Sequence, residues 1–495
     1  MSGSGCRDYR SSVGRRAVLG AGLGAGVGIG MGGLSVASAG VIDLSSVDRD
    51  TAVIQYWLNA AATHYETYDP KPDAPLGIRS PFHPIATNVP GTFLCESLPL
   101  HASLMDKVTL IRSVHHDNSD HQHGMHWCQT GHDAKANGIN PFKKSSHASS
   151  GCLVSMVRGS NHPGMPPYVF MGYPLDNQGP HRMYPHRGAY LPARFNPMEI
   201  LIKRTGDGKH PAQDKDFVVR SLSPAGGLSR KNFVQRRELL TQFEKIRGEA
   251  DPVATASWSA FHDSAFDLVA GEKTGSAFDL EQEDEATRRR YGYHRSGQSA
   301  LLARRLVERG VTFVTLIDPG VGLSSSGWDF HKTLEAHTKT ASPPMDLAVT
   351  TLINDLHERG LDKKVLVVVW GEFGRTPKIN KHGGRDHWAD VQSVMMAGGN
   401  YRHGQVIGSS NAKGEVPHER PLWPYDVVAT MYHHLGIDPS FTPITGATRT
   451  RPLLERGEVI RELLEQLDAH AQHVTMGPVA PVSGSFCWFV TSHCR

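Results

Sequence analysis

The sequence has few cysteines and none with the spacing of a metal-binding or redox pair. Six cysteines occur in 495 residues, and no two of them form a Cys-x-x-Cys motif. This argues against a zinc ribbon and a thioredoxin-like site. Cys6 lies in a segment that we expect to be removed, and an odd number remains, so at least one of these thiols stays unpaired within the chain: Cys95, Cys128, Cys152, Cys487 and Cys494.

The chain also lacks a strong excess of one charge. Its formal net charge is +3, and no basic stripe with interleaved aromatic residues is present. We therefore predict no nucleic-acid partner. The hydrophobic fraction of 39% and the charged fraction of 20% are typical of a globular protein.

The only extended apolar run is near the N-terminus, and its composition is that of an export signal. Arg15 and Arg16 precede a glycine- and alanine-rich run to about Val36, and Ala37-Ser38-Ala39 supplies small residues for cleavage. The paired arginines and the weak hydrophobicity favour the twin-arginine route. We expect a signal peptide at residues 1–39, recognition by the twin-arginine export machinery and a periplasmic or extracellular location. No later stretch reaches the length of a membrane span, so we expect none after signal removal.

The remaining sequence alternates short apolar runs with helical patterns. The run Val365–Trp370 is apolar on both faces, as is typical of a parallel strand covered by helices on both sides. Helices are predicted at Gln298–Arg309 and Met345–Arg359, each followed by glycine. This order predicts an α/β fold with a central, mostly parallel sheet and helices on both faces. Strands are expected at Thr51–Leu58, Val108–Val114, Tyr168–Met171, Val311–Ile317, Val365–Trp370 and Gln392–Ala397.

Two segments do not follow this pattern. Residues 174–216 are rich in Pro, Gly, His and Arg, and we interpret them as an irregular insertion at the sheet edge. Residues 468–495 form a tail of unassigned role. One α/β domain is therefore expected over residues 40–467.

Polar side chains follow three of the predicted strands. In open α/β sheets, ligands bind at the carboxyl ends of the strands. The three loops supply carboxylate, imidazole and hydroxyl groups to that edge. Their candidate residues are Thr63, Glu66 and Asp69 in the first loop, Asp329 and His331 in the second, and Glu372, Arg375, Asp386 and His387 in the third.

This set of groups suits hydrolysis assisted by one or two divalent metal ions. Carboxylate and imidazole ligands favour zinc, manganese or iron. A Thr or Ser hydroxyl could act as the nucleophile, and Arg375 could hold an oxyanion through two hydrogen bonds. A histidine-rich segment after another strand could also line the site: His115, His116, Asp117, His121, His123 and His126.

Several motifs resemble one known family. They are YDPKPDAP at 68–75, IRSVHHDN at 111–118, RRRYG at 288–292, GQSALLARRLVERGVTFV at 297–314, GWDFH at 327–331 and VVVWGEFGRTPKIN…GRDHW at 367–388. From residue 5 to about 467 the chain resembles the bacterial domain-of-unknown-function family one-five-zero-one, a distant relative of alkaline phosphatases and sulfatases. The resemblance implies an alkaline-phosphatase-like fold.

The resemblance also implies roles for individual residues. Asp329 and His331 match the first Asp/His metal pair, Glu372 stands where the Asp of an Asp-His pair is expected, and His387 matches the last metal-binding His. Thr63 is the implied nucleophile, and Glu66 or Asp69 is the implied first carboxylate. Asp386, beside His387, is a further candidate ligand.

The chain departs from the family pattern at three places, one of which is Glu66, where relatives tend to have Asp. Phe373 replaces the His of the Asp-His pair, which puts one metal in doubt. Ala60, Ala61 and Ala62 stand where relatives tend to have Gly-Gly-Pro, and three alanines are more typical of a helix start. A sulfatase Cys/Ser-x-Pro-x-Arg motif is absent around the cysteines.

Two functions remain open. The first is an exported metal-dependent hydrolase acting on a phosphate or sulfate ester of a small molecule or polysaccharide. The second is a catalytically degenerate binding or structural protein on the same fold, which recognises a glycan or a partner protein. Metal ligands that converge in the structure would favour the hydrolase.

Overall fold

The computed structural model describes residues 50–134, 145–172, 186–202, 217–219, 230–248, 272–318, 327–442 and 452–464. The predicted signal peptide at 1–39 and the tail at 468–495 lie outside these residues.

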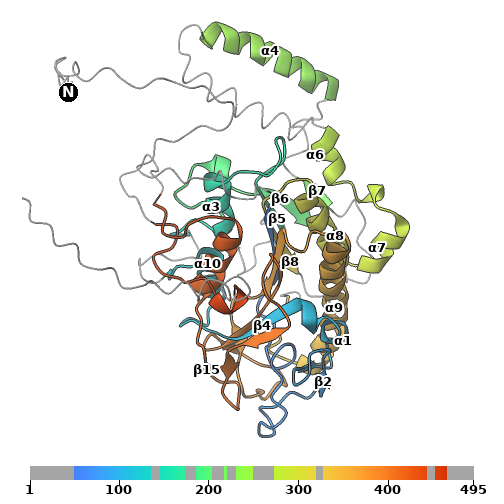
Figure 1. Cartoon of the computed structure of the whole chain (residues 1–495), viewed down its shortest axis with the longest axis vertical. Coiled ribbons are helices and arrows are strands. Elements are labelled where there is room, and N and C mark those ends of the chain that lie inside the picture. The colour runs from blue at the N-terminus through green and yellow to red at the C-terminus, as the bar shows by residue number, and fades with distance from the viewer. Residues whose placement is uncertain are drawn as a thin grey trace, which may run out of the picture. The chain divides into compact units, whose positions relative to one another are not determined.

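Nine strands form one central sheet (Figure 1). They are β1 (Ala52–Leu58), β4 (Val108–Val114), β5 (Tyr168–Gly172), β6 (Met198–Ile202), β7 (Phe217–Val219), β8 (Phe313–Asp318), β9 (Val365–Trp370), β12 (Gln392–Gly398) and β13 (Gln405–Ile407). Their order is β13-β4-β12-β9-β1-β8-β5-β6-β7. The six strands predicted from the sequence are confirmed, each within two residues at either end.

The sheet is mostly parallel, as predicted, but it is mixed. β1 pairs in parallel with β8 and β9 at the centre of the sheet. β12 instead runs antiparallel to both β9 and β4. The connection from β9 to β12 therefore starts and ends at the same sheet edge, which keeps residues 371–391 beside the carboxyl ends of β1, β8 and β9.

Alternation along the central strands produces two hydrophobic cores. Ile54, Tyr56 and Leu58 belong to one core, whereas Val53 and Trp57 belong to the other. This follows from the two-residue period of a strand, in which successive side chains point to opposite faces.

Helices cover both faces of the sheet, which confirms the predicted α/β architecture. α8 (Arg295–Glu308) and α9 (Leu334–Glu358) pack on one face, and α3 (Ser150–Val157) and α10 (Pro424–His434) pack on the other (Figure 1). Among the described residues, the remaining α-helices are α1 (Pro99–Ala102), α2 (His121–Thr130), α4 (Arg230–Gly248), α6 (Glu272–Ala277) and α7 (Glu285–Tyr291). Single 3₁₀ turns occupy η2 (Met105–Lys107), η4 (Ala193–Phe195), η8 (Leu280–Gln282) and η9 (Arg461–Leu463).

Two predictions of local structure were incomplete. α9 begins at Leu334 and contains Pro343 and Pro344, so it is longer than the helix expected from Met345 onward. Proline usually ends a helix, but packing of the flanking turns keeps this one continuous. Within residues 174–216, the interpretation as an irregular insertion is wrong for β6, which pairs in parallel with β5.

Three two-stranded ribbons accompany the main sheet: β2 (Pro84–Ala86) with β3 (Phe93–Cys95), β10 (Gly374–Arg375) with β11 (His387–Trp388), and β14 (Ser409–Ser410) with β15 (Pro417–Glu419). The β10–β11 ribbon lies within the β9–β12 connection and contains His387, one of the predicted site residues.

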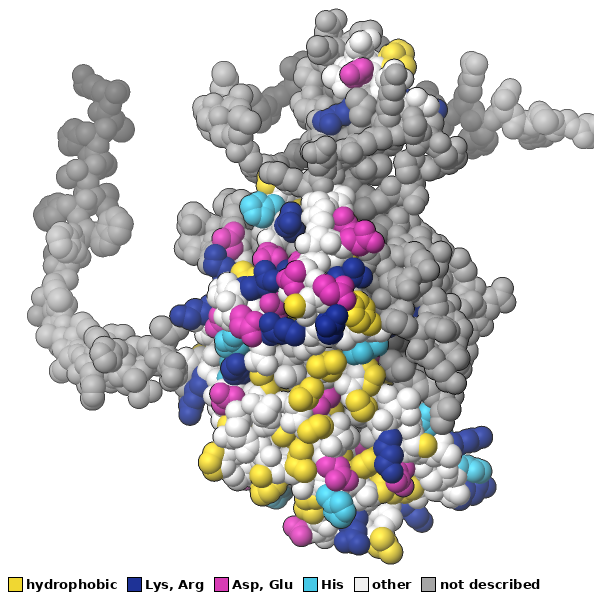
Figure 2. All heavy atoms as spheres, turned by 90° about the vertical axis from the view of Figure 1, so that its right-hand side faces the viewer, with side chains coloured by type: hydrophobic (Ala, Val, Ile, Leu, Met, Phe, Trp, Pro, Cys, Tyr) yellow, Lys and Arg dark blue, Asp and Glu magenta, His cyan; other side chains and the backbone are white. Residues whose placement is uncertain are grey.

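On the face shown in Figure 2, basic and acidic side chains are interspersed. The ion pairs that join α7, α8 and α9 include Arg290–Glu358 at 2.7 Å, Arg359–Glu308 at 3.2 Å and Arg304–Asp355 at 3.0 Å. Within the described residues, no helix combines the length and apolar character that crossing a membrane requires.

Candidate metal centre

The three predicted loops meet at the edge where β1, β8 and β9 end. The amide of Trp328 donates to the carbonyl of Asn59 at 2.8 Å, which ties the loop after β8 to the end of β1. The amide of Arg385 donates to the carbonyl of Phe330 at 3.0 Å, which ties the third loop to the second. The expected convergence of these loops is therefore present.

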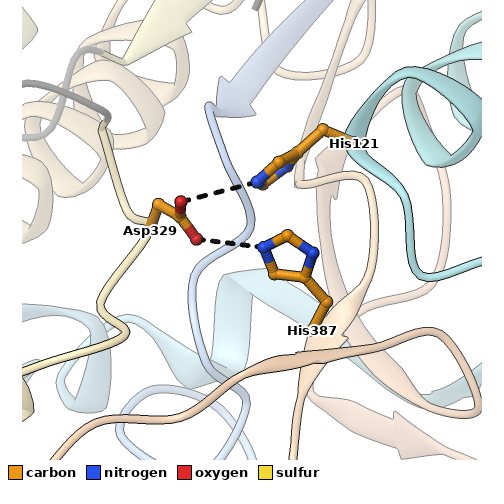
Figure 3. Close-up of side chains that lie close together, drawn as sticks. All are labelled: His121, Asp329 and His387. Carbon is orange, nitrogen blue, oxygen red and sulfur yellow. Dashed lines mark hydrogen bonds and ion pairs between the residues drawn. The ribbon is translucent and has the colours of Figure 1, made fainter. Parts of the chain in front are cut away.

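Asp329 is the centre of a cluster of histidines (Figure 3). One of its carboxylate oxygens lies 3.2 Å from Nε2 of His387 and 3.0 Å from Nε2 of His331. The other lies 3.6 Å from Nε2 of His121. One ligand atom from each of His121, Asp329 and His387 lies within 4.8 Å of the others, so these three side chains could hold one cation.

The second ring nitrogen of each histidine is also engaged. Nδ1 of His121 lies 2.7 Å from the Glu372 carboxylate, and Nδ1 of His331 lies 2.7 Å from the Asp386 carboxylate. Nδ1 of His387 lies 2.8 Å from the carbonyl of Ser119. Donation from Nδ1 to such an acceptor leaves Nε2 with the lone pair and fixes the ring, which is the usual arrangement around metal-binding histidines.

His121 reaches the cluster because it is the first residue of α2. Asp120 caps the helix, since its side chain accepts from the amides of Gln122 and His123. His121 belongs to the histidine-rich segment that the sequence placed near the site, but nothing in the sequence separates it from its neighbours. Its first-turn position after a capping Asp is a usable signal, because a cap fixes where a helix begins.

His387 reaches the cluster through the β10–β11 ribbon, where it pairs with Arg375. The ribbon depends on Gly374, at which a Cβ atom would lie 1.9 Å from the carbonyl oxygen of Val391. Gly384 is equally constrained, because a Cβ there would lie 2.0 Å from the carbonyl carbon of His331. These two glycines explain why the GEFGRTP and GRDHW segments can pack so closely.

The electrostatics of the cluster follow from its burial and its mixed charges. Burial opposes a charge on His121, but the interactions with Asp329 and Glu372 outweigh it and raise the pKa of His121 to about 9. Burial alone would raise the pKa of Asp329, but His121, His387 and the charge of Arg375 hold it well below its usual range. Burial lowers the pKa of His387, and the hydrogen bond from His331 lowers the pKa of Asp386.

The donor set fits a divalent cation. Two imidazole nitrogens and one carboxylate match the three-ligand pattern of catalytic zinc sites, which leave a further position open. Glu372 is fully buried, and its second carboxylate oxygen has no hydrogen-bond partner among the described residues. A buried charge of this kind is costly unless positive charge lies close by. A cation held by His121 would supply that charge.

The first loop does not join this cluster as predicted. The Thr63 hydroxyl donates to the Glu66 carboxylate at 2.6 Å, and its side chain is buried. Glu66 accepts two hydrogen bonds from Arg385, at 2.9 and 3.0 Å, and both side chains are fully buried. The Glu66 carboxylate thus joins Thr63 to Arg385, and the roles of Thr63 as nucleophile and of Glu66 as metal ligand remain predictions.

Asp69 and Arg375 also differ from their expected roles. Asp69 pairs with Lys71 at 3.0 Å and accepts from Ser410 at 2.5 Å. Arg375 is buried and donates to the carbonyls of Ala60 and Ala61, while its guanidinium lies 2.7 Å from Asp329. With its donors committed to backbone and carboxylate oxygens, Arg375 holds the loops together and is not positioned to grip an oxyanion.

The prediction that Ala60, Ala61 and Ala62 begin a helix is wrong. Ala60 and Ala61 both have φ of 64°, in the left-handed region, and no helix forms there. A Cβ atom in this region costs roughly 1–2 kcal/mol per residue. The backbone thus adopts a turn suited to glycine although the sequence has alanine. The carbonyl groups of this turn are the acceptors of Arg375.

Phe373 lies against the cluster, at the position where the resemblance led us to expect a histidine. Its ring centroid is 5.1 Å from that of His121 and 4.8 Å from that of His387. The benzene ring supplies no ligand, so among the described residues one group of three candidate ligands lies around Asp329: His121, Asp329 and His387. Of the predicted metal residues, Asp329 and His387 are candidate ligands, while Glu372 and Asp386 orient histidines.

The fold and the site together define an α/β protein with a histidine–carboxylate centre at the carboxyl ends of its parallel strands. A model of the family described as "Protein of unknown function (DUF1501)" matches residues 50–464, and the chain belongs to this family. No curated protein matches the chain.

Solved structures to which the chain is similar include a sulfatase, a phosphonate monoester hydrolase and a protein in the alkaline phosphatase superfamily. The PsFucS1 sulfatase from Pseudoalteromonas sp. is 12% identical, with 80% of this chain and 69% of that chain covered and a TM-score of 0.34. The phosphonate monoester hydrolase SpPMH from Silicibacter pomeroyi is 11% identical, with 79% and 74% covered and a TM-score of 0.37. A protein in the alkaline phosphatase superfamily from Vibrio parahaemolyticus is 8% identical, with 78% and 66% covered and a TM-score of 0.34. Because these scores are low, we base no assignment of activity on them.

Proposed function

We propose that the protein is an exported, divalent-metal-dependent hydrolase of phosphate or sulfate esters, carried by small molecules or by polysaccharides. The observation that carries this proposal is the convergence of three imidazole Nε2 atoms on Asp329, each ring held by a second acceptor. The ester class comes from the resemblance of the motifs to relatives of alkaline phosphatases and sulfatases. The export route and the periplasmic or extracellular location come from the N-terminal segment.

The protein groups divide into ligands and orienting groups. His121, Asp329 and His387 would hold the cation, and zinc, manganese or iron suits these donors. Glu372 and the carbonyl of Ser119 orient the two imidazoles. A divalent cation held there would polarise the ester and lower the pKa of a water molecule.

His331 is placed to move a proton. Its side chain is 38% exposed, and its Nδ1 is backed by the Asp386 carboxylate at 2.7 Å. A carboxylate in this position fixes the orientation and the tautomer of the ring, as in His-Asp pairs of hydrolases. We assign to Nε2 of His331 the delivery of a proton to the leaving alcohol oxygen.

The Thr63 hydroxyl is buried and is hydrogen-bonded to the Glu66 carboxylate. A solvent-derived nucleophile therefore fits the arrangement better than a covalent intermediate on Thr63. This distinguishes the proposal from a mechanism in which a side chain attacks the ester.

The second candidate is a cation-binding protein without turnover, which recognises a glycan or a partner protein. The enclosed Thr63–Glu66–Arg385 group and the engaged Arg375 favour it, because the sequence predicted catalytic roles for Thr63 and Arg375. This candidate has the same cation site as the first, but it catalyses no hydrolysis.

The test combines metal content with turnover. Mature protein purified without chelators is analysed by elemental mass spectrometry and assayed with p-nitrophenyl phosphate and p-nitrophenyl sulfate. We expect Asp329→Asn to lose one equivalent of metal together with activity. We expect His331→Gln to keep that equivalent and to lower kcat by about 10²–10⁴-fold, the usual contribution of a general acid.

The outcomes separate the two candidates. Turnover that follows the Asp329-dependent metal supports the hydrolase. Metal bound at Asp329 without turnover of either ester, with retention on an immobilised glycan, supports the binding protein. A folded Asp329→Asn variant that keeps full metal content and activity would overturn the site itself.

A further inference from the structure

A second group of metal-binding side chains lies at the other end of α2. One ligand atom from each of His132, His147 and Glu455 lies within 4.8 Å of the others. These residues are far apart in sequence and come from the turn after α2, the segment before α3 and the segment after residue 451. None of them belongs to the site around Asp329.

The fold holds His132 in place. Gly131 ends α2 with φ of 74°, and the His132 amide donates to the Thr130 hydroxyl at 3.1 Å. Nε2 of His132 lies 3.1 Å from the carbonyl of Leu453, which joins the ring to the segment that carries Glu455. A hydrogen bond from Nε2 to a carbonyl orients the ring and fixes its tautomer.

His147 is held in a similar way. Its Nδ1 lies 2.9 Å from the Ser146 hydroxyl and 3.3 Å from Nε2 of His126. The Ser145 hydroxyl, which lies 3.2 Å from Nδ1 of His126, donates to the His147 carbonyl at 2.6 Å. The rings of His132 and His147 stack with centroids 4.1 Å apart and an interplanar angle of 8°.

The burial of these three residues and the chemistry of their side chains fit a small cation. His132 and His147 are buried, whereas Glu455 is exposed, so the group is closed on the protein side and open to solvent at the carboxylate. Two imidazoles and one carboxylate form the His₂Glu donor set known from zinc sites. Neutral imidazole is the commonest metal ligand in proteins.

We propose that His132, His147 and Glu455 form a second divalent-cation site, of the zinc class, which fastens the segment 452–464 to the end of α2. Leu454 already packs there, since a Cβ at Gly131 would meet its side chain at 2.5 Å. Bound metal would add a cross-link between parts of the chain more than 300 residues apart in sequence. Its role is structural and is independent of the proposed hydrolysis.

The experiment uses the full mature protein and Zn²⁺ alone. Isothermal titration calorimetry gives the number of bound ions, and thermal unfolding with and without Zn²⁺ gives the stabilisation. We expect Glu455→Gln to weaken one class of Zn²⁺ sites by at least about 10-fold, and His147→Gln to weaken it by about 100-fold or more. Glu458→Gln is the matched control, because Glu458 is an exposed carboxylate on the same segment.

Glu455 is exposed, so its substitution tests the site without endangering the fold. Zn²⁺ stoichiometry and affinity unchanged in both Glu455→Gln and a folded His147→Gln would overturn the proposal. Asp329→Asn should leave this class of sites intact. If instead Asp329→Asn loses no ion while Glu455→Gln loses one, the site at Asp329 fails and this one stands.

Discussion

Asp329 and Glu66 are two carboxylates at the same edge of the sheet, and their charges are balanced in different ways. Asp329 faces three imidazoles as well as the Arg375 guanidinium, and its side chain is 13% exposed. Glu66 faces one guanidinium, and neither side chain of that pair is exposed. Imidazole loses its proton near neutral pH, whereas guanidinium stays charged at every pH at which the protein is folded.

The positive charge beside Asp329 can therefore be exchanged, whereas the positive charge beside Glu66 cannot. We call Asp329 with its three histidines the exchangeable group and the pair Glu66–Arg385 the permanent group. A cation can replace the protons of the histidines around Asp329, because metal binding and proton release are coupled. Nothing can replace Arg385 at Glu66 without rebuilding the fold. The same edge of the sheet thus holds one group suited to ligand exchange and one suited to stability.

The largest expected effect concerns the permanent group. Glu66→Gln leaves the Arg385 charge buried without a counter-charge, and we expect a loss of about 3–5 kcal/mol in the free energy of unfolding. Denaturant unfolding measures it. The exposed pair Arg289–Glu285 is the control, and Glu285→Gln should change the free energy by less than about 0.5 kcal/mol. Equal losses in the two variants would contradict the comparison.

The next effect concerns the exchangeable group. Asp329→Asn removes the carboxylate shared by the histidines, and we expect Zn²⁺ affinity at this site to fall by at least about 100-fold. Asp329→Asn also removes a counter-charge of the buried Arg375, so circular dichroism is recorded on the same samples to compare the fold of the variant with that of the parent protein. Asp362→Asn is a matched control, because Asp362 pairs with His357 at 3.4 Å away from the site. Calorimetric titration distinguishes the two variants.

A smaller loss is expected where the carboxylate only orients a ligand. Glu372→Gln keeps an oxygen that can accept from Nδ1 of His121 but removes the negative charge. We expect Zn²⁺ affinity to fall by about 10-fold, with no loss of an equivalent at saturation. An affinity equal to that of Asp329→Asn would instead make Glu372 a direct ligand.

The protein should also lose stability in acid because of His64, which lies two residues before Glu66 in the sequence. Burial lowers the pKa of His64 to about 4, whereas an unfolded histidine titrates near 6.5. The unfolded chain therefore takes up a proton first, so stability is complete above pH 6.5 and declines as the pH falls toward 4. The slope due to His64 is up to about 1.4 kcal/mol per pH unit. His64→Gln should flatten the acid limb of unfolding, whereas His382→Gln, at an exposed position, should not.

The smallest effect concerns the turn that Arg375 holds. Ala61→Gly relieves a positive φ but loses a buried methyl group and adds chain entropy, so we expect a net change below about 0.5 kcal/mol. Ala62, outside the positive-φ pair, should show the ordinary cost of about 1 kcal/mol in Ala62→Gly. A larger loss at Ala61 than at Ala62 would show that the methyl group matters more than the strain.

Much of the fold was predictable because the central strands are short and apolar. Val365–Trp370 is apolar on both faces, and it lies beside β1 in the middle of the sheet. The antiparallel direction of β12 could not be predicted, since strand direction depends on where residues 371–391 return. The sequence did not predict β6 because the residues on either side of it show no regular alternation of apolar and polar side chains.

The site was predictable to the level of the loops and of Asp329 and His387. The sequence cannot show that Arg385 reaches back to Glu66, because the two residues lie 319 positions apart. It also cannot choose His121 from its histidine-rich segment, since the choice depends on the direction in which α2 leaves Asp120. Both features depend on contacts between residues far apart in the sequence, and the local sequence pattern does not indicate such contacts.

α2 connects the two proposed cation sites, with His121 in its first turn and His132 just past its end. The helix is about 15 Å long and turns by about 100° per residue. Inserting one residue into it would leave His121 in place but swing His132 around the axis, away from His147. The length of α2 is therefore a constraint in its own right, and relatives that keep both sites should vary in the sequence of this helix but not in its number of residues.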